Sequence, residues 1–364
     1  MKQAHTGGKG NGKKGNSKGN FTKQQMLRRK YRMTILRNAI ISVLTVLLVV
    51  VGTAYLYLHL VFKGPSETFS DQLASTLMET SAMKIVPQIF FSDEEIEAIL
   101  AKNKVVAPEE ETDLSLITIQ AREETPEGEQ TAEDDDGIEI VPVTGPTYKG
   151  YMMIVSDPSR VSVGTCADSF NNAPGLQLDK IAQRYNAVGA INGGAFSDAG
   201  GMGNGGTPLG LVISNGQCLM DGMSVEGQDV LIGFDENDRL IIGRMSKAQA
   251  KERKIRDAVT FGPALIINGE SAAVMGAGSG LNPRTAIGQR ADGAVLMLVI
   301  DGRQISSLGA SYQDLIEIML EFGAVNAANL DGGSSSLMYY EGEFLNNGFV
   351  LVGSRQMPTA FVVK

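Results

Sequence analysis

The sequence predicts an α+β protein: a mixed β-sheet domain with few helices, preceded by a single transmembrane helix and a helical stalk. Three observations lead to this prediction. A continuous apolar run occupies residues 39–62 near the N-terminus, and a stretch with helix-capping signals follows it. From residue 145 onward the chain holds 33 of its 43 glycines. Short apolar runs alternate there with turn signals, which is typical of a β-rich domain.

Charge separates the N-terminal region from the rest of the chain. Residues 1–66 contain 12 Lys and Arg and no Asp or Glu, although the whole chain has a formal net charge of -9. Eleven of these basic residues precede the apolar run and only Lys63 follows it. The positive-inside rule therefore predicts that residues 1–38 form a basic cytoplasmic tail and that the bulk of the chain is extracytoplasmic. Attachment to anionic lipid headgroups explains this tail more simply than nucleic-acid binding does.

The apolar run at 39–62 has the length of a membrane anchor. At about 1.5 Å per residue it extends over roughly 36 Å, which exceeds a hydrocarbon core of about 30 Å. A cleavable signal peptide that ends near Ala54 is the alternative, but the run continues for eight residues beyond that position. Arg28 and Arg29 could also belong to a twin-arginine signal, but a basic flank of the membrane span explains these two residues more simply. We therefore predict a single-pass protein of the cell membrane.

The two segments that follow the apolar run differ in composition. Residues 63–107 are predicted to form a helical stalk, because Ser92 and Glu95 have the spacing of a capping box ahead of an apolar run. Residues 108–146 hold 13 acidic residues against one base and few large apolar residues. A segment of this kind gains too little burial to offset its conformational entropy, so we expect an acidic linker.

Residues 147–364 are predicted to form the β-rich domain. Eleven apolar runs are strand candidates, at 151–155, 161–163, 187–191, 209–214, 230–234, 240–242, 264–267, 285–288, 295–300, 336–340 and 360–363. Helical spacing of apolar residues at 178–185 and 315–322 predicts two helices. Ser311 and Asp314 would begin the second helix, and Gly323 would end it.

Histidine and cysteine usage exclude several kinds of chemistry. The only histidines are His5 and His59, so the β-rich domain has none. This excludes Ser-His-Asp hydrolases and histidine-based metalloenzymes. Cys166 and Cys218 are compatible with one disulfide or with two free thiols, and no histidine is present to activate either as a nucleophile.

A literal G-x-G-x-x-G pattern at 201–206 lacks the context of a dinucleotide site. A Thr-Pro pair and a strand-like run follow it, where a nucleotide-binding domain would begin a helix. We therefore predict no cofactor. A divalent cation between carboxylates of the active site is left open as an alternative.

Four polar clusters stand next to predicted strands, where we expect them to meet at a sheet edge. They are Asn192-Gly193-Gly194-Ala195-Phe196, Asn282-Pro283-Arg284-Thr285, Asp301-Gly302-Arg303 and Asn329-Leu330-Asp331-Gly332-Gly333-Ser334-Ser335-Ser336. Any one of them alone is typical of a turn. Together they supply carboxylates, arginine guanidinium groups and glycine backbone that a ligand can approach closely, which favours an oxyanion such as phosphate.

These motifs, in this order, resemble those of the phosphodiester glycosidase family. The resemblance covers residues 147–364 and includes NGGAF, TPLGLVISNG, FGPALIINGE, NPRTAIG, VIDGRQ and NLDGGSSSLMY. It implies hydrolysis of a sugar-1-phosphodiester at the anomeric carbon, which releases the sugar and leaves a phosphomonoester. The chain departs from the pattern at Asn282, where the family has histidine before Pro-Arg-Thr.

The resemblance and the residue types assign roles within the clusters. Asp331 is the expected carboxylate that activates water or stabilises an oxocarbenium-like centre, with Asp301 as its partner. Arg284 and Arg303 are expected to bind phosphate, a leaving group that needs charge stabilisation more than protonation. Further substrate-binding candidates are Asn192, Gly193, Gly194, Thr285, Asn329, Gly332, Gly333, Ser334, Ser335 and Arg355. No metal ligand is predicted.

The predicted function is therefore that of a membrane-anchored, extracytoplasmic hydrolase. Its expected substrate is a sugar-phosphate glycan or polymer of the cell envelope or an exopolysaccharide, and we expect no nucleic-acid partner. Two alternatives are a non-catalytic glycan-binding module on the same fold and a metal-dependent phosphodiesterase that cleaves the P–O bond.

Overall fold

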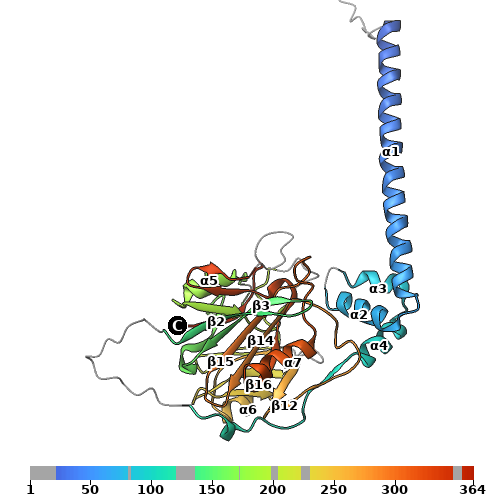
Figure 1. The fold of residues 1–364 in the computed structure, drawn as a ribbon. Coiled ribbons are helices and arrows are strands. Elements are labelled where there is room, and N and C mark those ends of the chain that lie inside the picture. Colours follow the sequence, from blue (N-terminus) through green and yellow to red (C-terminus); the bar gives the residue numbers. More distant parts are fainter. Residues whose placement is uncertain are drawn as a thin grey trace, which may run out of the picture. The chain divides into compact units, whose positions relative to one another are not determined.

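The computed structural model describes residues 22–80, 83–119, 136–171, 173–197, 204–222, 230–346 and 355–364. The chain divides into two compact units, Met1–Leu60 and Val61–Lys364. Each unit is described separately below, and Figure 1 shows the elements along the chain.

Helix α1, Lys23–Phe62, contains the predicted apolar run. Its mean hydropathy reaches 2.5 over an 18-residue window, so by length and composition it is able to cross a membrane. The helix begins well before residue 39 because residues 23–38 include neither Gly nor Pro. It ends just before Gly64 and Pro65, because proline cannot continue a helix.

Three short helices make up a helical segment, residues 66–104, within the stretch 63–107 for which the sequence predicted a helical stalk. They are α2 (Glu67–Met78), α3 (Ile85–Phe90) and α4 (Asp93–Lys102). The predicted capping box begins α4, since Ser92 Oγ accepts from the Glu95 amide and the Glu95 carboxylate accepts from the Ser92 amide. Lys102 joins α4 to α2 through Glu67 at 2.6 Å and Asp71 at 3.0 Å.

The β-rich part contains three main sheets, and every strand pair within the described residues is antiparallel. The seven-stranded sheet has the order β12-β11-β16-β14-β15-β3-β2. Its strands are β2 (Ile138–Thr144), β3 (Lys149–Val155), β11 (Ala264–Ile267), β12 (Glu270–Ser271), β14 (Arg284–Arg290), β15 (Val295–Ile300) and β16 (Ala324–Leu330).

Two five-stranded sheets complete the framework, together with one small ribbon. The first has the order β7-β6-β10-β8-β9, formed by β6 (Leu211–Ser214), β7 (Gln217–Asp221), β8 (Val230–Asp235), β9 (Leu240–Gly243) and β10 (Ile255–Phe261). The second has the order β18-β17-β5-β19-β4, formed by β4 (Val161–Thr165), β5 (Gly189–Asn192), β17 (Met338–Tyr340), β18 (Glu343–Phe344) and β19 (Thr359–Val363). The ribbon pairs β1 (Val105–Val106) with β13 (Ala273–Val274).

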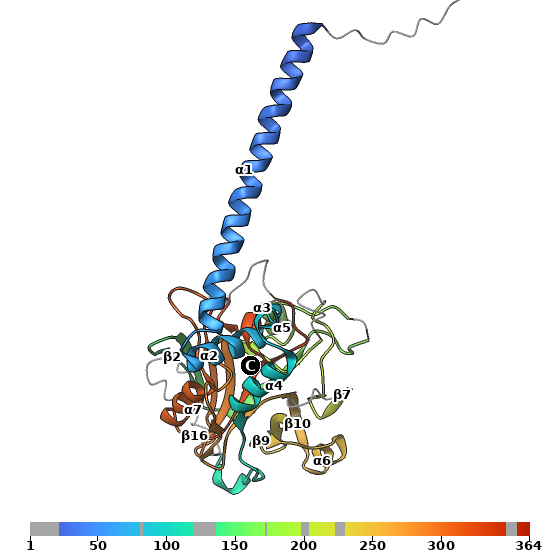
Figure 2. The same ribbon diagram turned by 90° about the vertical axis from the view of Figure 1, so that its right-hand side faces the viewer.

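Helices α5 (Leu178–Arg184), α6 (Lys247–Glu252) and α7 (Tyr312–Glu321) pack on these sheets. Figures 1 and 2 show α7 against β16, and its buried residues Leu315 and Met319 share a core with residues of the seven-stranded sheet. A second core joins the three sheets, where Phe234 of β8 meets Phe361 of β19 edge to face at 6.2 Å. The predicted α+β class is confirmed.

Two central strands escaped the sequence analysis because they contain buried polar residues. In β10, Asp257 Oδ1 accepts hydrogen bonds from the Val163 and Asn215 amides. In β16, Asn326 is 0% exposed and its Oδ1 accepts from the Asn268 amide. Polar side chains that are satisfied in this way are compatible with a buried strand, although they interrupt the apolar pattern.

The structure differs from the expected linker, 108–146, at both of its ends. Strand β2 pairs with β3 in a continuous register from Ile138↔Val155 to Thr144↔Lys149. Thr112 is 7% exposed and exchanges two hydrogen bonds with Ile242 of β9. These ends carry the few apolar residues of the segment, which explains why they pack. Most of the acidic residues lie at 120–135, outside the described residues.

Both cysteines are free thiols. Cys166 is buried, and burial raises the pKa of its thiol. Cys218 is half-buried and its thiol donates to the Met220 carbonyl at 3.3 Å. Of the two alternatives that the sequence left open, the structure has the one without a disulfide.

Candidate functional site

The strand register brings three of the four predicted clusters together at one edge of the seven-stranded sheet. This edge is formed by the ends of neighbouring strands and not by an outer strand. Arg284, the first residue of β14, pairs with the last residue of β15, and Thr285 pairs with the last residue of β16. Asp301 and Asp331 directly follow those two strands. Because β14 is antiparallel to both neighbours, its start lies beside both of their ends. Both aspartates and both arginine-bearing clusters therefore lie at the same edge.

Asn192 joins the fourth cluster to this edge. It is the last residue of β5 and 1% exposed. Its Nδ2 donates to the Asp331 carbonyl at 2.6 Å. Its Oδ1 accepts from the Thr285 hydroxyl at 2.7 Å and the Leu337 amide at 3.2 Å. The amide of Asn192 thus holds the chain after β16 against β14.

The glycines after Asn192 allow two segments to pack closely. A Cβ on Gly193 would lie 2.9 Å from the Thr359 carbonyl oxygen, and one on Gly194 would lie 2.7 Å from the Thr260 carbonyl oxygen. The Gly193 carbonyl also accepts from the Asp331 amide at 3.2 Å. Close backbone packing explains both glycines without reference to a ligand.

The two candidate catalytic aspartates are both half-buried and are held differently. Asp301 Oδ1 accepts from Asn346 Nδ2 at 2.9 Å, and the same amide donates to the Ser336 carbonyl. Asp331 is positioned through its backbone by Gly193 and Asn192. Both residues keep part of their surface exposed.

The side chain of Arg303 packs against the backbone of the Gly-Gly-Ser turn that follows Asp331. A Cβ on Gly333, whose φ is +63°, would lie 3.3 Å from Arg303 Nη1. The Gly333 amide donates to the Pro283 carbonyl at 2.9 Å. Ser334 is half-buried, like Gly332, whereas Ser335 is 2% exposed. Ser334 is therefore the more accessible of the two predicted serines.

Thr285 and Asn329 lie beneath this edge. Thr285 is 0% exposed and donates its hydroxyl to Asn192. Asn329 is 1% exposed and its Nδ2 donates to the Gly262 carbonyl at 2.9 Å. The Thr285 hydroxyl and the Asn329 amide nitrogen are thus bonded within the protein, whereas Asn329 Oδ1 is buried without a hydrogen-bond partner among the described residues.

Arg284 is buried and held on several sides. Its side chain is 4% exposed, and its guanidinium carbon lies 4.0 Å from the centre of the Tyr312 ring. Nε donates to the Ala310 carbonyl and Nη2 to the Gly280 carbonyl, both at 3.3 Å. Nη1 lies 3.0 Å from a carboxylate oxygen of Glu79. Burial is the largest single influence and lowers the pKa of Arg284, but the interactions with Glu79 and Tyr312 together outweigh it, so the pKa is raised.

Arg303 is half-buried at the tip of the Asp-Gly-Arg turn. Its φ of +58° is unusual for a non-glycine residue, and Nη2 donates to Thr80 Oγ1 at 2.9 Å and Asn282 Oδ1 at 3.1 Å. Burial lowers the pKa of Arg303, and the charges of Arg284 and Arg355 add to this effect, although Glu79 opposes it. The guanidinium carbon of Arg355 lies 5.0 Å from the centre of the Phe196 ring. Three guanidinium groups thus interact electrostatically within one region.

Glu79 is the residue of this region that the sequence analysis missed. It caps the C-terminus of α2, and its Oε2 accepts from Asn282 Nδ2 at 2.8 Å while pairing with Arg284. Its side chain is 27% exposed. Burial raises the pKa of Glu79, and the charges of Arg284 and Arg303 oppose that rise. No local pattern marks this glutamate, because its partners lie about 200 residues away along the chain.

Asn282 connects Glu79 to Arg303, because its Nδ2 donates to the first and its Oδ1 accepts from the second. It is 2% exposed. The position at which the resemblance expects histidine is therefore filled by an amide that links the helical segment to the arginines.

The helical segment holds the loop before Asn282 at further points. Thr76 Oγ1 accepts from the Leu281 amide at 3.1 Å. Asn103 Oδ1 accepts from the Ala277 amide at 2.5 Å. The helical segment and the arginine region thus form one continuous structure within the second unit.

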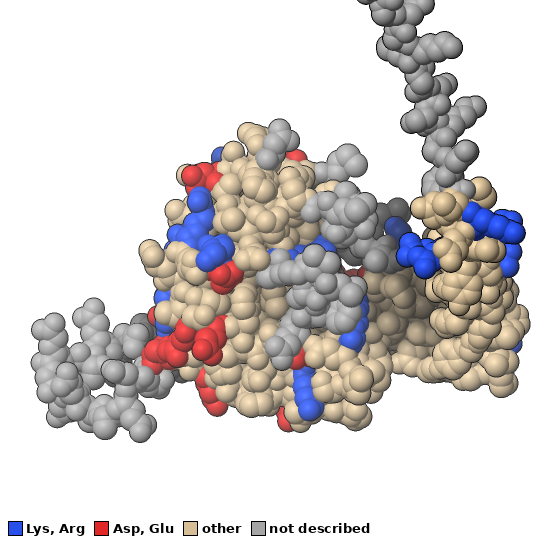
Figure 3. All heavy atoms as spheres, turned by 90° about the horizontal axis from the view of Figure 1, so that it is seen from above, with Lys and Arg blue, Asp and Glu red and all other residues tan. Residues whose placement is uncertain are grey.

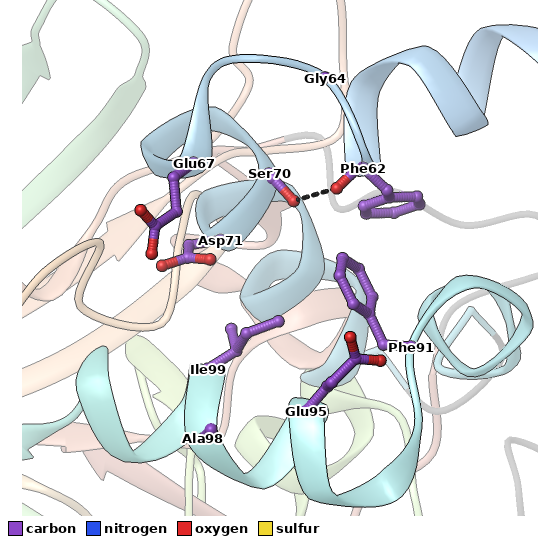
Figure 4. Close-up of a pocket in the computed structure, with 9 residues that line it drawn as sticks. All are labelled: Phe62, Gly64, Glu67, Ser70, Asp71, Phe91, Glu95, Ala98 and Ile99. Carbon is purple, nitrogen blue, oxygen red and sulfur yellow. Dashed lines mark hydrogen bonds between the residues drawn. The ribbon is translucent and has the colours of Figure 1, made fainter.

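Other features of the surface do not coincide with this region. Within the described residues, no group of three or more His, Cys, Asp or Glu side chains could hold a metal ion. On the face in Figure 3, basic and acidic side chains are scattered over a largely uncharged surface. A cavity of about 290 Å³ lies elsewhere, between residues 62–71 and residues 91–99 (Figure 4). It is lined by Phe62, Gly64, Glu67, Ser70, Asp71, Phe91, Glu95, Ala98 and Ile99, none of which is a predicted site residue.

The fold is a β-rich α+β domain in which two aspartates and a cluster of arginines lie at one edge of the seven-stranded sheet. Residues 185–364 match the family model described as phosphodiester glycosidase. Over these residues the chain is therefore similar to the phosphodiester glycosidase family, and this match supports a glycosidase-type function.

Two related proteins extend this comparison. The SPbeta prophage-derived uncharacterized protein YomE of Bacillus subtilis is 33% identical over 175 residues, which cover 46% of this chain and 26% of that protein. The chain therefore spans about a quarter of that relative's length. The catalytic domain of zebrafish N-acetylglucosamine-1-phosphodiester alpha-N-acetylglucosaminidase, described as auto-inhibited by its pro-peptide, has 20% identity and a TM-score of 0.51. The match covers 72% of this chain and 96% of that domain, and it shows a shared fold.

Proposed function

We propose that this protein is a membrane-anchored hydrolase that cleaves a sugar-1-phosphodiester at the anomeric C–O bond. The observation that carries this proposal is the convergence of Asp301, Asp331 and Arg303 at one sheet edge, in a domain that is similar to the phosphodiester glycosidase family. Its substrate would be a sugar-phosphate glycan of the cell envelope or an exopolysaccharide.

In the proposed reaction the bond between C1 of the sugar and the phosphate oxygen breaks. The electron pair leaves with the phosphate, and a water molecule adds to C1 and gives up one proton, which Asp331 would accept and pass to the solvent. Asp331 would activate the water or stabilise the positive charge that develops at C1, and Asp301 would assist it. Arg303, with backbone and hydroxyl donors from the Gly332–Ser335 turn, would stabilise the departing phosphate through charge-assisted hydrogen bonds. A phosphate leaving group makes a site without histidine chemically adequate.

In this structure the carboxylate of Glu79 lies next to Arg284, in the region that we assign to the substrate phosphate. Glu79 contacts Arg284 Nη1 and Asn282 Nδ2, which are donors that a substrate phosphate would otherwise attract. We propose that the helical segment holds the site closed through Glu79 and that substrate binding requires Glu79 to leave. The zebrafish domain is described as auto-inhibited by its pro-peptide, and residues 66–104 would act in the same sense here.

Helix α1 supports the anchored arrangement. It combines a long apolar run with basic residues before it, which favours a cytoplasmic N-terminus and an extracytoplasmic hydrolase. The topology is tested by protease treatment of intact cells, which would digest residues 61–364 and leave the basic tail protected.

The experiment that tests the reaction measures release of reducing sugar from an N-acetylglucosamine-1-phosphodiester. The native chain and Glu79→Gln are assayed, each with and without Asp331→Asn. We expect release that depends on Asp331 and is greater in the Glu79→Gln background. Binding of sugar-1-phosphodiesters without release in either background would instead identify a non-catalytic glycan-binding module.

Hydrolysis in oxygen-18 water identifies the bond that breaks. Attack at C1 places the label in the sugar, whereas attack at phosphorus places it in the phosphate. Label in the phosphate would favour the alternative of a phosphodiesterase and would contradict glycosidase chemistry.

A further inference from the structure

Large apolar side chains of α2, of α3 and of the turn before α3 are exposed to solvent. Phe69 of α2 is 52% exposed, Met83 is 46% exposed, and Ile85 and Ile89 of α3 are 62% and 61% exposed. Ile85 and Ile89 are four residues apart, so they lie on the same face of α3. We refer to these four residues as the apolar patch. The number of large exposed apolar side chains in this short segment favours a surface that contacts a partner.

The helices that bear the apolar patch are fixed to the last turn of α1. Phe62 ends that helix, is 3% exposed, and packs against the rings of Phe90 and Phe91 at centroid distances of 5.1 Å and 5.4 Å. Ser70 of α2 donates its hydroxyl to the Phe62 carbonyl at 2.9 Å. Since Val61 and Phe62 belong to the second unit, these contacts are internal to it.

The charges around the apolar patch suit a lipid surface. Lys84 is exposed, and Lys63, which is also exposed, pairs with Glu95 at 3.3 Å. The Lys63 ammonium lies 4.3 Å from the centre of the Phe91 ring. Aliphatic and aromatic side chains with lysines at their margin are the composition that enters the headgroup region of a bilayer, where the lysines meet anionic lipids.

We propose that the apolar patch contacts the bilayer that α1 spans. This inference rests on the proposed anchoring. If the apolar run ends at the membrane surface near Phe62, then α2 and α3, which touch Phe62, lie at headgroup depth. The side chains would enter about 5–10 Å into the interface, as amphipathic helices do. The segment that carries Glu79 would then be held by lipid on one side and by Arg284 on the other.

The chain contains no tryptophan, so a single introduced indole reports its own surroundings. The full chain is reconstituted into vesicles of phosphatidylcholine and phosphatidylglycerol, with or without brominated acyl chains. Reporters are placed by Ile85→Trp, Ile89→Trp and the conservative Phe69→Trp. Leu56→Trp in α1 reports insertion of the anchor, and Leu320→Trp, at a position of α7 that is 43% exposed, reports a surface residue away from the patch.

We expect brominated lipid to quench the patch reporters at least roughly half as strongly as Leu56→Trp, and to leave Leu320→Trp unaffected. The patch reporters should also emit at shorter wavelength than Leu320→Trp. If Leu56→Trp is quenched but the patch reporters match Leu320→Trp, the lipid contact is wrong while anchoring stands. If the patch emission is shifted without quenching, protein covers the patch, which also overturns the inference. If Leu56→Trp is itself unquenched, the anchoring on which the inference rests is wrong.

Discussion

The Glu79 carboxylate lies 3.0 Å from Nη1 of Arg284, and this contact joins the helical segment to the edge of the seven-stranded sheet. Nε and Nη2 of Arg284 donate to backbone carbonyls, and Glu79 pairs with the remaining nitrogen, Nη1. Asn282 donates to the same carboxylate oxygen. A negative charge therefore already occupies part of the region that we assign to the substrate phosphate.

Replacing Glu79 with glutamine should increase activity. Glutamine keeps the size of the side chain but removes the charge that competes with phosphate for the arginines. Because a hydrogen bond to a charged group contributes about 1.5–3 kcal/mol, kcat/KM for a sugar-1-phosphodiester should rise by roughly tenfold or more. Steady-state kinetics in detergent solution measure this change. Glu97→Gln, an exposed position of α4, is the matched control and should leave the kinetics unchanged.

A lower kcat in Glu79→Gln with an unchanged KM would contradict the closed-site proposal, because it would make Glu79 a participant in the reaction. An unchanged kcat/KM would contradict it as well, since the charge would then have no effect on substrate binding.

The raised pKa of Glu79 predicts that the stability of the protein depends on pH. Burial raises the pKa of Glu79 above its ordinary value of 4.5, so the folded state binds this proton more tightly than the unfolded state. That contribution to stability is fully present below the unfolded-state pKa and is lost as pH rises through the folded-state pKa. The free energy of unfolding of the wild type, relative to Glu79→Gln, should therefore fall as pH rises above about 4.5. Urea unfolding of both proteins at a series of pH values measures it, and a difference that is constant with pH would refute the prediction.

Replacing either aspartate with asparagine should abolish most of the activity and preserve the fold. Asp331→Asn and Asp301→Asn keep the shape of the side chain, and the amide oxygen introduced by Asp301→Asn would still accept from Asn346. Loss of a general base or charge-stabilising carboxylate should lower kcat by about 10²–10⁴-fold. Initial rates measure the loss, and denaturant unfolding verifies that stability is retained. Full activity of both variants would remove the two aspartates from the mechanism.

The position of Asp301 could be predicted from the sequence because this residue follows an apolar strand, β15. Asp331 follows β16, a strand that the sequence analysis missed, and only the polar cluster around Asp331 indicated its position. Both strands flank β14. Strand ends in an antiparallel sheet meet at one edge wherever the register places them together, and a polar residue after an apolar run marks such an end. The capping boxes at Ser92 and Ser311 were predictable for the same reason, since each depends on residues three positions apart.

Glu79 could not be predicted, because its contacts come only from the packing of the helical segment on the distant loop before Asn282. Nothing in the sequence indicated that Asn192, Thr285 and Asn329 are buried. Their side-chain types suit a ligand as well as they suit internal hydrogen bonds, and only the fold decides which partner is present. The substrate contacts proposed for these residues stay predictions.

Asn192 should be needed for stability as well as for activity. Its side chain bonds to the Asp331 carbonyl, the Thr285 hydroxyl and the Leu337 amide at a site that is 1% exposed. Alanine would leave these buried groups without partners, so Asn192→Ala should lower the free energy of unfolding by about 3 kcal/mol. Denaturant unfolding measures this, with Gln313→Ala on the exposed face of α7 as a control that should change it by less than about 0.5 kcal/mol. A loss as small as that of the control would show that the strand edge does not depend on this amide.

Replacing Arg303 with lysine should weaken the stabilisation of the departing phosphate, although the positive charge is retained. The Arg303 guanidinium lies against Gly333, donates to Thr80 and Asn282, and presents a planar set of donors that a lysine ammonium cannot reproduce. If these donors stabilise the departing phosphate, kcat/KM for a sugar-1-phosphodiester should fall by roughly 10–100-fold in Arg303→Lys. The effect should be largest for phosphodiester substrates whose leaving groups are the poorest, because these depend most on charge stabilisation in the transition state. Kinetics with a series of leaving groups, in the Glu79→Gln background so that the site is open, measure this dependence. An equal loss for every leaving group would assign Arg303 to binding the ground state, and no loss at all would remove it from the phosphate site.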